Sequence, residues 1–194
     1  MLSCQRCSAQ APLLLRRLLC SSSAAALPSP PSPPAPVTAS SLSQAFALRA
    51  SAVSLQLRSS AELSCANIMC EQLGKGCACR LALTLGRMQL LEHVDVSCNA
   101  LPALPEELLQ LPRLRLLQAR GNALTALGSS SSSSWRAVAL EELDLRDNAL
   151  RELPGQQLAA LPRLQRLLCS GNPLSEAAQR VLQGLREKGV HCEF

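Results

Sequence analysis

The sequence predicts an α/β solenoid in which short strands form a parallel concave sheet and helical or irregular segments return along the convex side. One nine-residue phrase, L-x-x-L-x-L-x-x-N, occurs four times. The phrases end at Asn99, Asn122, Asn148 and Asn172, which are 23, 26 and 24 residues apart. Only 2% of the 194 residues are aromatic. A core of leucine, alanine and valine is therefore needed, and a stack of equal turns supplies one.

Each phrase has the pattern of a short strand followed by a turn. Positions four and six lie on the same side of a strand, whereas positions three, five and seven lie on the other. The asparagine amide has donors and an acceptor for backbone groups of its own turn and the neighbouring one. We therefore expect a leucine interior and a ladder of asparagines along the stack.

Residues 1–26 have the composition of an organelle transit peptide, because they contain arginine and serine but no acidic residue and no lysine. Residues 13–19 can form an amphipathic basic helix. Arg16, Leu18 and Ser21 also resemble the R-x-L-x-x-S cleavage pattern of mitochondrial presequences. The sequence thus favours a mitochondrial location. The alternatives are the plastid, the cytoplasm (with no targeting signal) and secretion.

Residues 27–49 are expected to be a disordered linker rich in proline and serine, since positions 28–36 read PSPPSPPAP. Together with residues 1–26 they give a disordered N-terminus. A second low-complexity run, 128–134, lies in the step of 26 residues between Asn122 and Asn148, lengthens that step and is expected to bulge from the returning side.

Residues 50–90 allow two interpretations. Ala52, Leu55, Leu57 and Ser60 form a degenerate copy of the phrase, with serine in place of asparagine. The stretch is either a first repeat with a long insertion or an N-terminal cap with a helix at about 79–90. Its cysteines are Cys65, Cys70, Cys77 and Cys79.

These cysteines are candidates for a zinc site, for a disulfide-bonded cap or for small reduced core residues. Their spacing, C-x4-C-x6-C-x-C, departs from the paired C-x2–4-C of zinc sites. We therefore favour reduced core residues and expect no metal and no cofactor.

Residues 91–194 form the repeat domain and end in a cap. Ser175 is placed to cap a helix that runs to about Lys188, and Gly189 ends it. Residues 190–194 then read as a short final strand. The end of a repeat stack needs such a cover over its core.

The phrases and the L-P-x-L returns at residues 101–104 resemble the leucine-rich repeat family, in its intracellular type of 23–24 residues. The resemblance covers residues 91–194. It implies a scaffold that binds a partner protein through the concave face. The candidate binding residues on that face are Glu92, His93, Asp95, Arg115, Gln118, Arg120, Glu142, Asp144, Arg146 and Arg166.

Two of these candidates, Arg120 and Arg146, occupy the same position in neighbouring phrases. Like charges would therefore lie about 4.8 Å apart. They are expected either to receive an acidic partner or to pair with Asp144 and Asp147.

The composition argues against several other functions. Five arginines and no acidic residue lie in the first 61 residues, which leaves 14 basic and 14 acidic residues beyond them. This neutrality argues against a nucleic-acid partner. No apolar stretch is long enough to span a membrane. The chain lacks phosphate-loop and catalytic-triad motifs, so we expect that the protein is not an enzyme. The alternatives are a cysteine-dependent metal-binding or enzymatic module and a truncated repeat remnant.

Overall fold

The computed structural model describes residues 36–63, 78–128 and 135–194, which belong to one compact unit. The expected transit peptide, most of the proline-rich run and the serine run at 129–134 lie outside the described residues.

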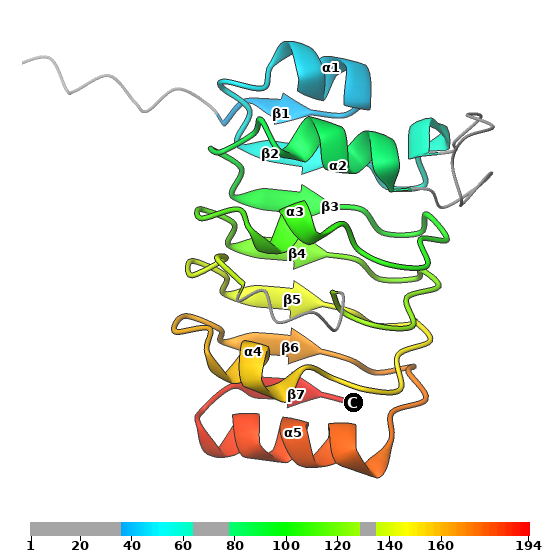
Figure 1. Ribbon diagram of the computed structural model, residues 1–194, viewed down its shortest axis with the longest axis vertical. Helices are drawn as coiled ribbons and strands as arrows, with labels where there is room; N and C mark the ends of the chain where they lie inside the picture. The colour runs from blue at the N-terminus through cyan, green and yellow to red at the C-terminus, as the bar shows by residue number, and fades with distance from the viewer. Residues whose placement is uncertain (1–35, 64–77, 129–134) are drawn as a thin grey trace, which may run out of the picture. The chain divides into compact units, whose positions relative to one another are not determined.

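A parallel sheet of seven strands runs through the unit in sequence order (Figure 1). The strands are β1 (Thr38–Ala39), β2 (Ser54–Gln56), β3 (His93–Asp95), β4 (Leu116–Gln118), β5 (Glu142–Asp144), β6 (Arg166–Leu168) and β7 (His191–Glu193). Each strand pairs only with its neighbours in sequence, as expected of stacked turns. The prediction of an α/β solenoid with a parallel sheet is confirmed.

The register of the sheet follows the phrase position by position. Position four runs through the stack as Leu55, Val94, Leu117, Leu143, Leu167 and Cys192, all paired in line. These side chains are at most 3% exposed. Position six supplies a second buried row of Leu57, Val96, Ala119, Leu145 and Cys169. The two rows form the leucine-rich interior that the alternation predicts.

The four asparagines form the predicted ladder. Each Nδ2 donates to the position-six carbonyl of the preceding turn at 2.7–3.0 Å; these carbonyls belong to Leu57, Val96, Ala119 and Leu145. Each Oδ1 accepts a backbone N–H of the preceding turn at 2.7–3.1 Å. The amides therefore satisfy backbone groups that a turn at the end of a strand leaves without a partner.

Helices return along the other face of the sheet (Figure 1). They are α1 (Leu42–Ala47), a 3-10 turn (Ala61–Leu63), α2 (Cys79–Leu85), α3 (Glu106–Leu109), α4 (Gly155–Ala159) and α5 (Glu176–Glu187). Helices α3 and α4 are short because Pro105 and Pro154 precede them and Pro112 and Pro162 soon follow. Proline suits the first turn of a helix and disfavours helical backbone at the residue before it.

The second half of the expected linker is folded, which corrects the boundary at residue 49. Ser41 caps α1 by accepting the backbone N–H of Gln44 at 3.0 Å. Leu42 and Ala45 are 3% and 0% exposed. β1 and α1 thus add one turn to the stack ahead of the degenerate phrase, and they cover its apolar side.

The degenerate phrase contributes a complete strand, since β2 pairs in register with both β1 and β3. Within the expected helical range, α2 spans Cys79–Leu85, and Leu81, Leu85 and Met88 are fully buried. Cys65, Cys70 and Cys77 lie outside the described residues.

The C-terminal cap is confirmed. The Ser175 side chain accepts the backbone N–H of Ala178 at 3.2 Å and begins α5. Gly189 follows the helix with a φ of +89°, a conformation that glycine adopts without strain. Leu182 and Leu185, at 0% and 3% exposure, cover the core behind β6 and β7.

Candidate functional site

The candidate residues lie on one solvent-facing strip of the sheet. We call the side chains at positions two, three, five and seven of the turns containing β3–β6 the concave strip. Position three aligns His93, Leu116, Glu142 and Arg166 across the four strands, and position five aligns Asp95, Gln118, Asp144 and Leu168. All ten predicted residues thus come together on this strip, in the order that the register prescribes.

Arg115 joins three turns in the half of the strip where the strands begin. Its guanidinium lies 3.0 Å from the Glu141 carboxylate and 4.0 Å from that of Glu92. Next to it, Arg166 lies 3.2 Å from Glu142. A shallow hollow of about 290 Å³ is lined by Arg115, Glu141, Glu142 and Arg166 together with His93, Leu116 and Gln165. Its lining residues are polar or charged except for half-buried Leu116, which contributes apolar surface.

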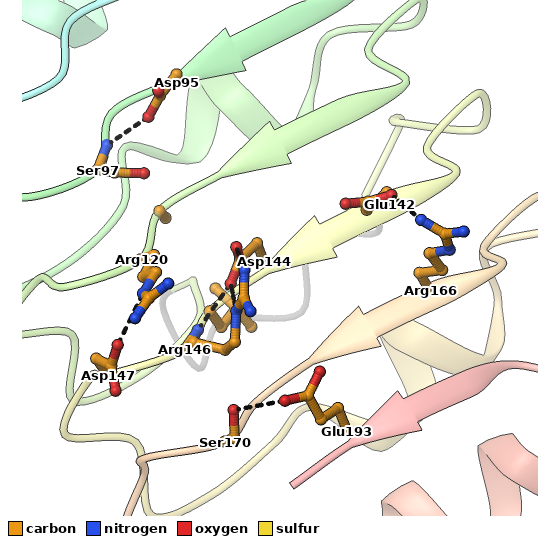
Figure 2. A network of polar contacts seen from close by, with 12 residues as sticks. Asp95, Ser97, Arg120, Glu142, Asp144, Arg146, Asp147, Arg166, Ser170 and Glu193 are labelled. Atoms are coloured by element: carbon orange, nitrogen blue, oxygen red, sulfur yellow. Dashed lines mark hydrogen bonds and ion pairs between the residues drawn. The ribbon is translucent and has the colours of Figure 1, made fainter.

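Two ion pairs occupy the half of the strip where the strands end (Figure 2). Arg120 lies 2.8 Å from Asp147, and both side chains are 52% exposed. Arg146 forms a bidentate ion pair with Asp144, with the closest N–O distance at 2.7 Å. The two arginines therefore pair with Asp147 and Asp144, as one of the two sequence-based alternatives expected.

Asp144 is a supporting residue within the strip. It is 3% exposed, and its carboxylate also accepts the backbone N–H of Arg146 at 3.1 Å. A buried carboxylate needs hydrogen-bond donors, and Arg146 supplies them from its backbone and its guanidinium. These charge-assisted bonds to Asp144 fix the orientation of the Arg146 side chain. The hydrogen bond to Asp144 in turn raises the pKa of the Arg146 guanidinium.

These two pairs give a matched prediction. Arg146→Gln is expected to lower the free energy of unfolding by about 1–3 kcal/mol, because it leaves a buried carboxylate without its cation. Arg120→Gln removes an exposed pair and is expected to cost about 0–1 kcal/mol. Urea unfolding of both variants measures the difference. Equal losses would contradict a supporting role for Asp144.

The sequence alone missed one contribution to this surface. Glu193 of β7 aligns with Leu168 at position five, and its carboxylate accepts the Ser170 hydroxyl at 3.2 Å (Figure 2). The final strand was interpreted only as a cap. Continuing the register by one strand would have placed Glu193 on the strip.

The concave strip and its border carry more acid than base. In the turns of β3–β6 the carboxylates are those of Glu92, Asp95, Glu141, Glu142, Asp144 and Asp147, against Arg115, Arg120, Arg146 and Arg166. Since each arginine already has a carboxylate neighbour, the excess charge is negative.

The described cysteines form no metal site: no group of three or more His, Cys, Asp or Glu side chains within the described ranges is arranged to hold a metal ion. Cys79 and Cys98 are exposed, whereas Cys169 and Cys192 are buried in the core. Burial raises the pKa of Cys169 from its ordinary value of 9.0 to about 12, and it also raises the pKa of Cys192. These two thiols are core residues.

The raised thiol pKa values predict a loss of stability in alkali. Cys169 stays protonated in the folded chain up to about pH 12, whereas in the unfolded chain it ionises near its ordinary pKa of 9.0. Its contribution to stability is therefore complete below pH 9 and falls as the pH rises towards 12. Urea unfolding between pH 9 and 12 should show that the free energy of unfolding falls less steeply with pH for Cys169→Ala than for the parent chain. Identical pH profiles of the two chains would contradict the burial of the thiol.

None of the helices in the described part of the chain is long and apolar enough to cross a membrane.

Comparison with known proteins finds several relatives, each matched over about half of this chain. It is 39% identical over 95 residues to the geranylgeranyl transferase type-2 subunit alpha of Bos taurus. The matched residues make up 48% of this chain and 16% of that protein. It is 33% identical over 102 residues to the leucine-rich repeat serine/threonine-protein kinase 1 of Caenorhabditis elegans, covering 53% of this chain and 4% of the kinase. It is 40% identical over 87 residues to the transforming growth factor beta activator LRRC32 of Mus musculus, covering 44% and 12%.

The chain thus spans less than a fifth of the length of these relatives. A leucine-rich repeat protein of Leptospira interrogans is similar in structure, with a TM-score of 0.47, 25% identity, and coverage of 57% of this chain and 33% of that one. No family model matches the chain.

The identification therefore rests on agreement between sequence and geometry. The repeated phrase, the in-register parallel strands and the asparagine ladder all have the same period. Two of the relatives carry the repeat in their names. In phrase, register and asparagine ladder, the chain has the form of a leucine-rich repeat solenoid.

Proposed function

We propose that this protein is a non-catalytic interaction module that binds a partner protein through the concave strip. The observation that carries the proposal is the alignment of solvent-facing polar side chains across four successive turns on a rigid backbone. Strands hold such side chains in fixed positions, so binding orders little of the chain.

The charges of the strip define the kind of partner. Leu116 on β4 and Leu168 on β6 are half-buried and place two separate apolar side chains among the ion pairs of the strip. Because carboxylates outnumber arginines, a partner surface with excess positive charge is the complementary one.

The relatives that are named for leucine-rich repeats support a binding role. The transferase and kinase activities that two relatives have in their names are not carried over, because this chain matches 16% and 4% of those proteins.

Photo-crosslinking at two sites tests the proposal. A photoreactive amino acid at Gln118, in the middle of the strip, should capture a defined partner in cells. The same amino acid at Arg151, an exposed position outside the strip, should not. Glu92→Lys together with Glu142→Lys should abolish capture at Gln118, because both changes place positive charge where a basic partner would bind. Equal capture from Gln118 and Arg151 would contradict binding through the strip.

The location of the protein is a further proposal. The composition of residues 1–26, with arginine and without acid, supports delivery to mitochondria and cleavage near Ala25. Imaging of a C-terminally tagged copy, combined with N-terminal sequencing of the mature form, tests both points. A cytoplasmic signal and an intact N-terminus would contradict this location.

A further inference from the structure

Every turn that leads into a strand from β2 to β7 carries an exposed basic residue. In chain order these residues are Arg49, Arg87, Arg113, Arg136, Arg163 and Lys188. Each stands three to six residues before its strand. We call this set the basic edge.

The fold brings these six residues to one side of the molecule. All seven strands are parallel, so their starts lie at the same edge of the sheet (Figure 1). Neighbouring strands are about 4.8 Å apart, which spreads six successive turns over roughly 24 Å. The result is one cation for each turn along that edge.

Within the described part of the chain, the cations of the basic edge form no ion pair. The ion pairs found there use Arg115, Arg120, Arg146 and Arg166. The carboxylates in the same turns, Glu92 and Glu141, are both neighbours of Arg115 on the concave strip. The neutral balance of the domain thus combines an acidic strip with a basic edge.

Exposed apolar side chains accompany the cations. Phe46, near the end of α1, is 49% exposed and lies beneath two guanidinium groups, with Arg49 at 5.0 Å and Arg87 at 5.9 Å from the ring centroid. Val138, two residues after Arg136, is 53% exposed. Cations and exposed apolar groups therefore share the same edge.

We propose that the basic edge docks on a membrane surface that contains anionic phospholipid. Guanidinium groups bind phosphate with two parallel hydrogen bonds, and five of the six cations are arginines. Because the strand starts share one edge, the cations of successive turns can face a flat surface together. Val138 adds apolar contact at the headgroup level.

The same observations weigh against the other polyanions. Single-stranded nucleic acid is bound by stacking its bases on open aromatic rings. On this edge, the Phe46 ring already carries Arg49 and Arg87. An extended acidic peptide would bind the cations but gains little from Val138. The lipid surface is the partner that uses both kinds of side chain.

Vesicle sedimentation of the full chain at low salt tests the proposal. The chain should sediment with vesicles of phosphatidylcholine and phosphatidylserine, but not with phosphatidylcholine alone. Each cation near an anionic surface contributes about fivefold in affinity. The triple variant Arg113→Gln, Arg136→Gln, Arg163→Gln should therefore bind roughly 100-fold more weakly. Val138→Ser should weaken binding by roughly tenfold.

A matched control removes the same charge elsewhere. Arg58, Arg151 and Arg180 are exposed and lie outside the turns that lead into strands. Their triple replacement by glutamine should leave vesicle binding within about twofold. Circular dichroism should show the same unfolding temperature for both triple variants, which separates loss of binding from loss of fold.

Several outcomes would overturn the proposal. These are equal binding of the basic-edge variant and the parent, equal sedimentation with both kinds of vesicle, and capture of polyglutamate or a single-stranded oligonucleotide without capture of vesicles. Because Gln118 lies away from the basic edge, the outcome of photo-crosslinking on the concave strip does not depend on the outcome of vesicle sedimentation.

Discussion

Replacing Asn148 with alanine is expected to lower the free energy of unfolding by about 3 kcal/mol. Its Nδ2 donates to the carbonyls of Ala119, Leu145 and Arg146, and its Oδ1 accepts the backbone N–H of Leu124. The side chain is 8% exposed, so water cannot replace these bonds without opening the turn. Each buried polar group left without a partner costs about 1–3 kcal/mol.

Urea unfolding measures this loss, and Gln118→Ala is its control. Gln118 lies one turn away on the concave strip, where solvent reaches its half-buried side chain. Its replacement should change stability by no more than about 0.5 kcal/mol. If Asn148→Ala costs no more than the control, the asparagine does not hold neighbouring turns together.

The second large effect is expected from Leu143→Ala. Leu143 lies at position four of β5, between Leu117 and Leu167, and is fully buried. Truncating such a leucine removes apolar contacts and leaves a cavity, which costs about 2–5 kcal/mol. The turns on both sides lose the same neighbour, so a value in the upper half of that range is expected.

Leu83→Ala provides the matched control, since Leu83 is 78% exposed on α2. Its loss should change stability by about 0.5 kcal/mol or less. Both variants are compared by thermal and urea unfolding of the full chain. Equal effects would contradict a core built from position four of the phrase.

The repeat pattern predicted the inner half of each turn well. Side-chain direction in a strand alternates strictly, so positions four and six had to face the same side. The asparagine marked the end of each strand, which set the register from Val94 to Leu167. The small residues Ala119 and Cys169 also occupy the buried position six, because the neighbouring phrases fix the register of their turns.

The first turn was harder to predict from the sequence. β1 and α1 follow a proline-rich run, and their buried residues Ala39, Leu42 and Ala45 form no complete phrase. A two-residue strand carries no detectable period of its own. It forms because β2 offers a free edge, which is information from the folded structure.

The charges of the surface were only partly predictable. Asp144 and Arg146 are two residues apart on a strand, so they had to share a face, but the sequence did not show that Asp144 would be buried. The basic edge was hidden by the neutral total. Its separation from the acidic concave strip depends on the parallel order of the strands.

The most direct test of the stacked turns is hydrogen exchange at the side-chain amides of Asn99, Asn122, Asn148 and Asn172, followed by NMR. If each Nδ2 donates to the preceding turn, these protons should exchange far more slowly than those of a free asparagine amide. Exchange of all four at the free rate would contradict the ladder and the in-register stack on which the concave strip and the basic edge both depend.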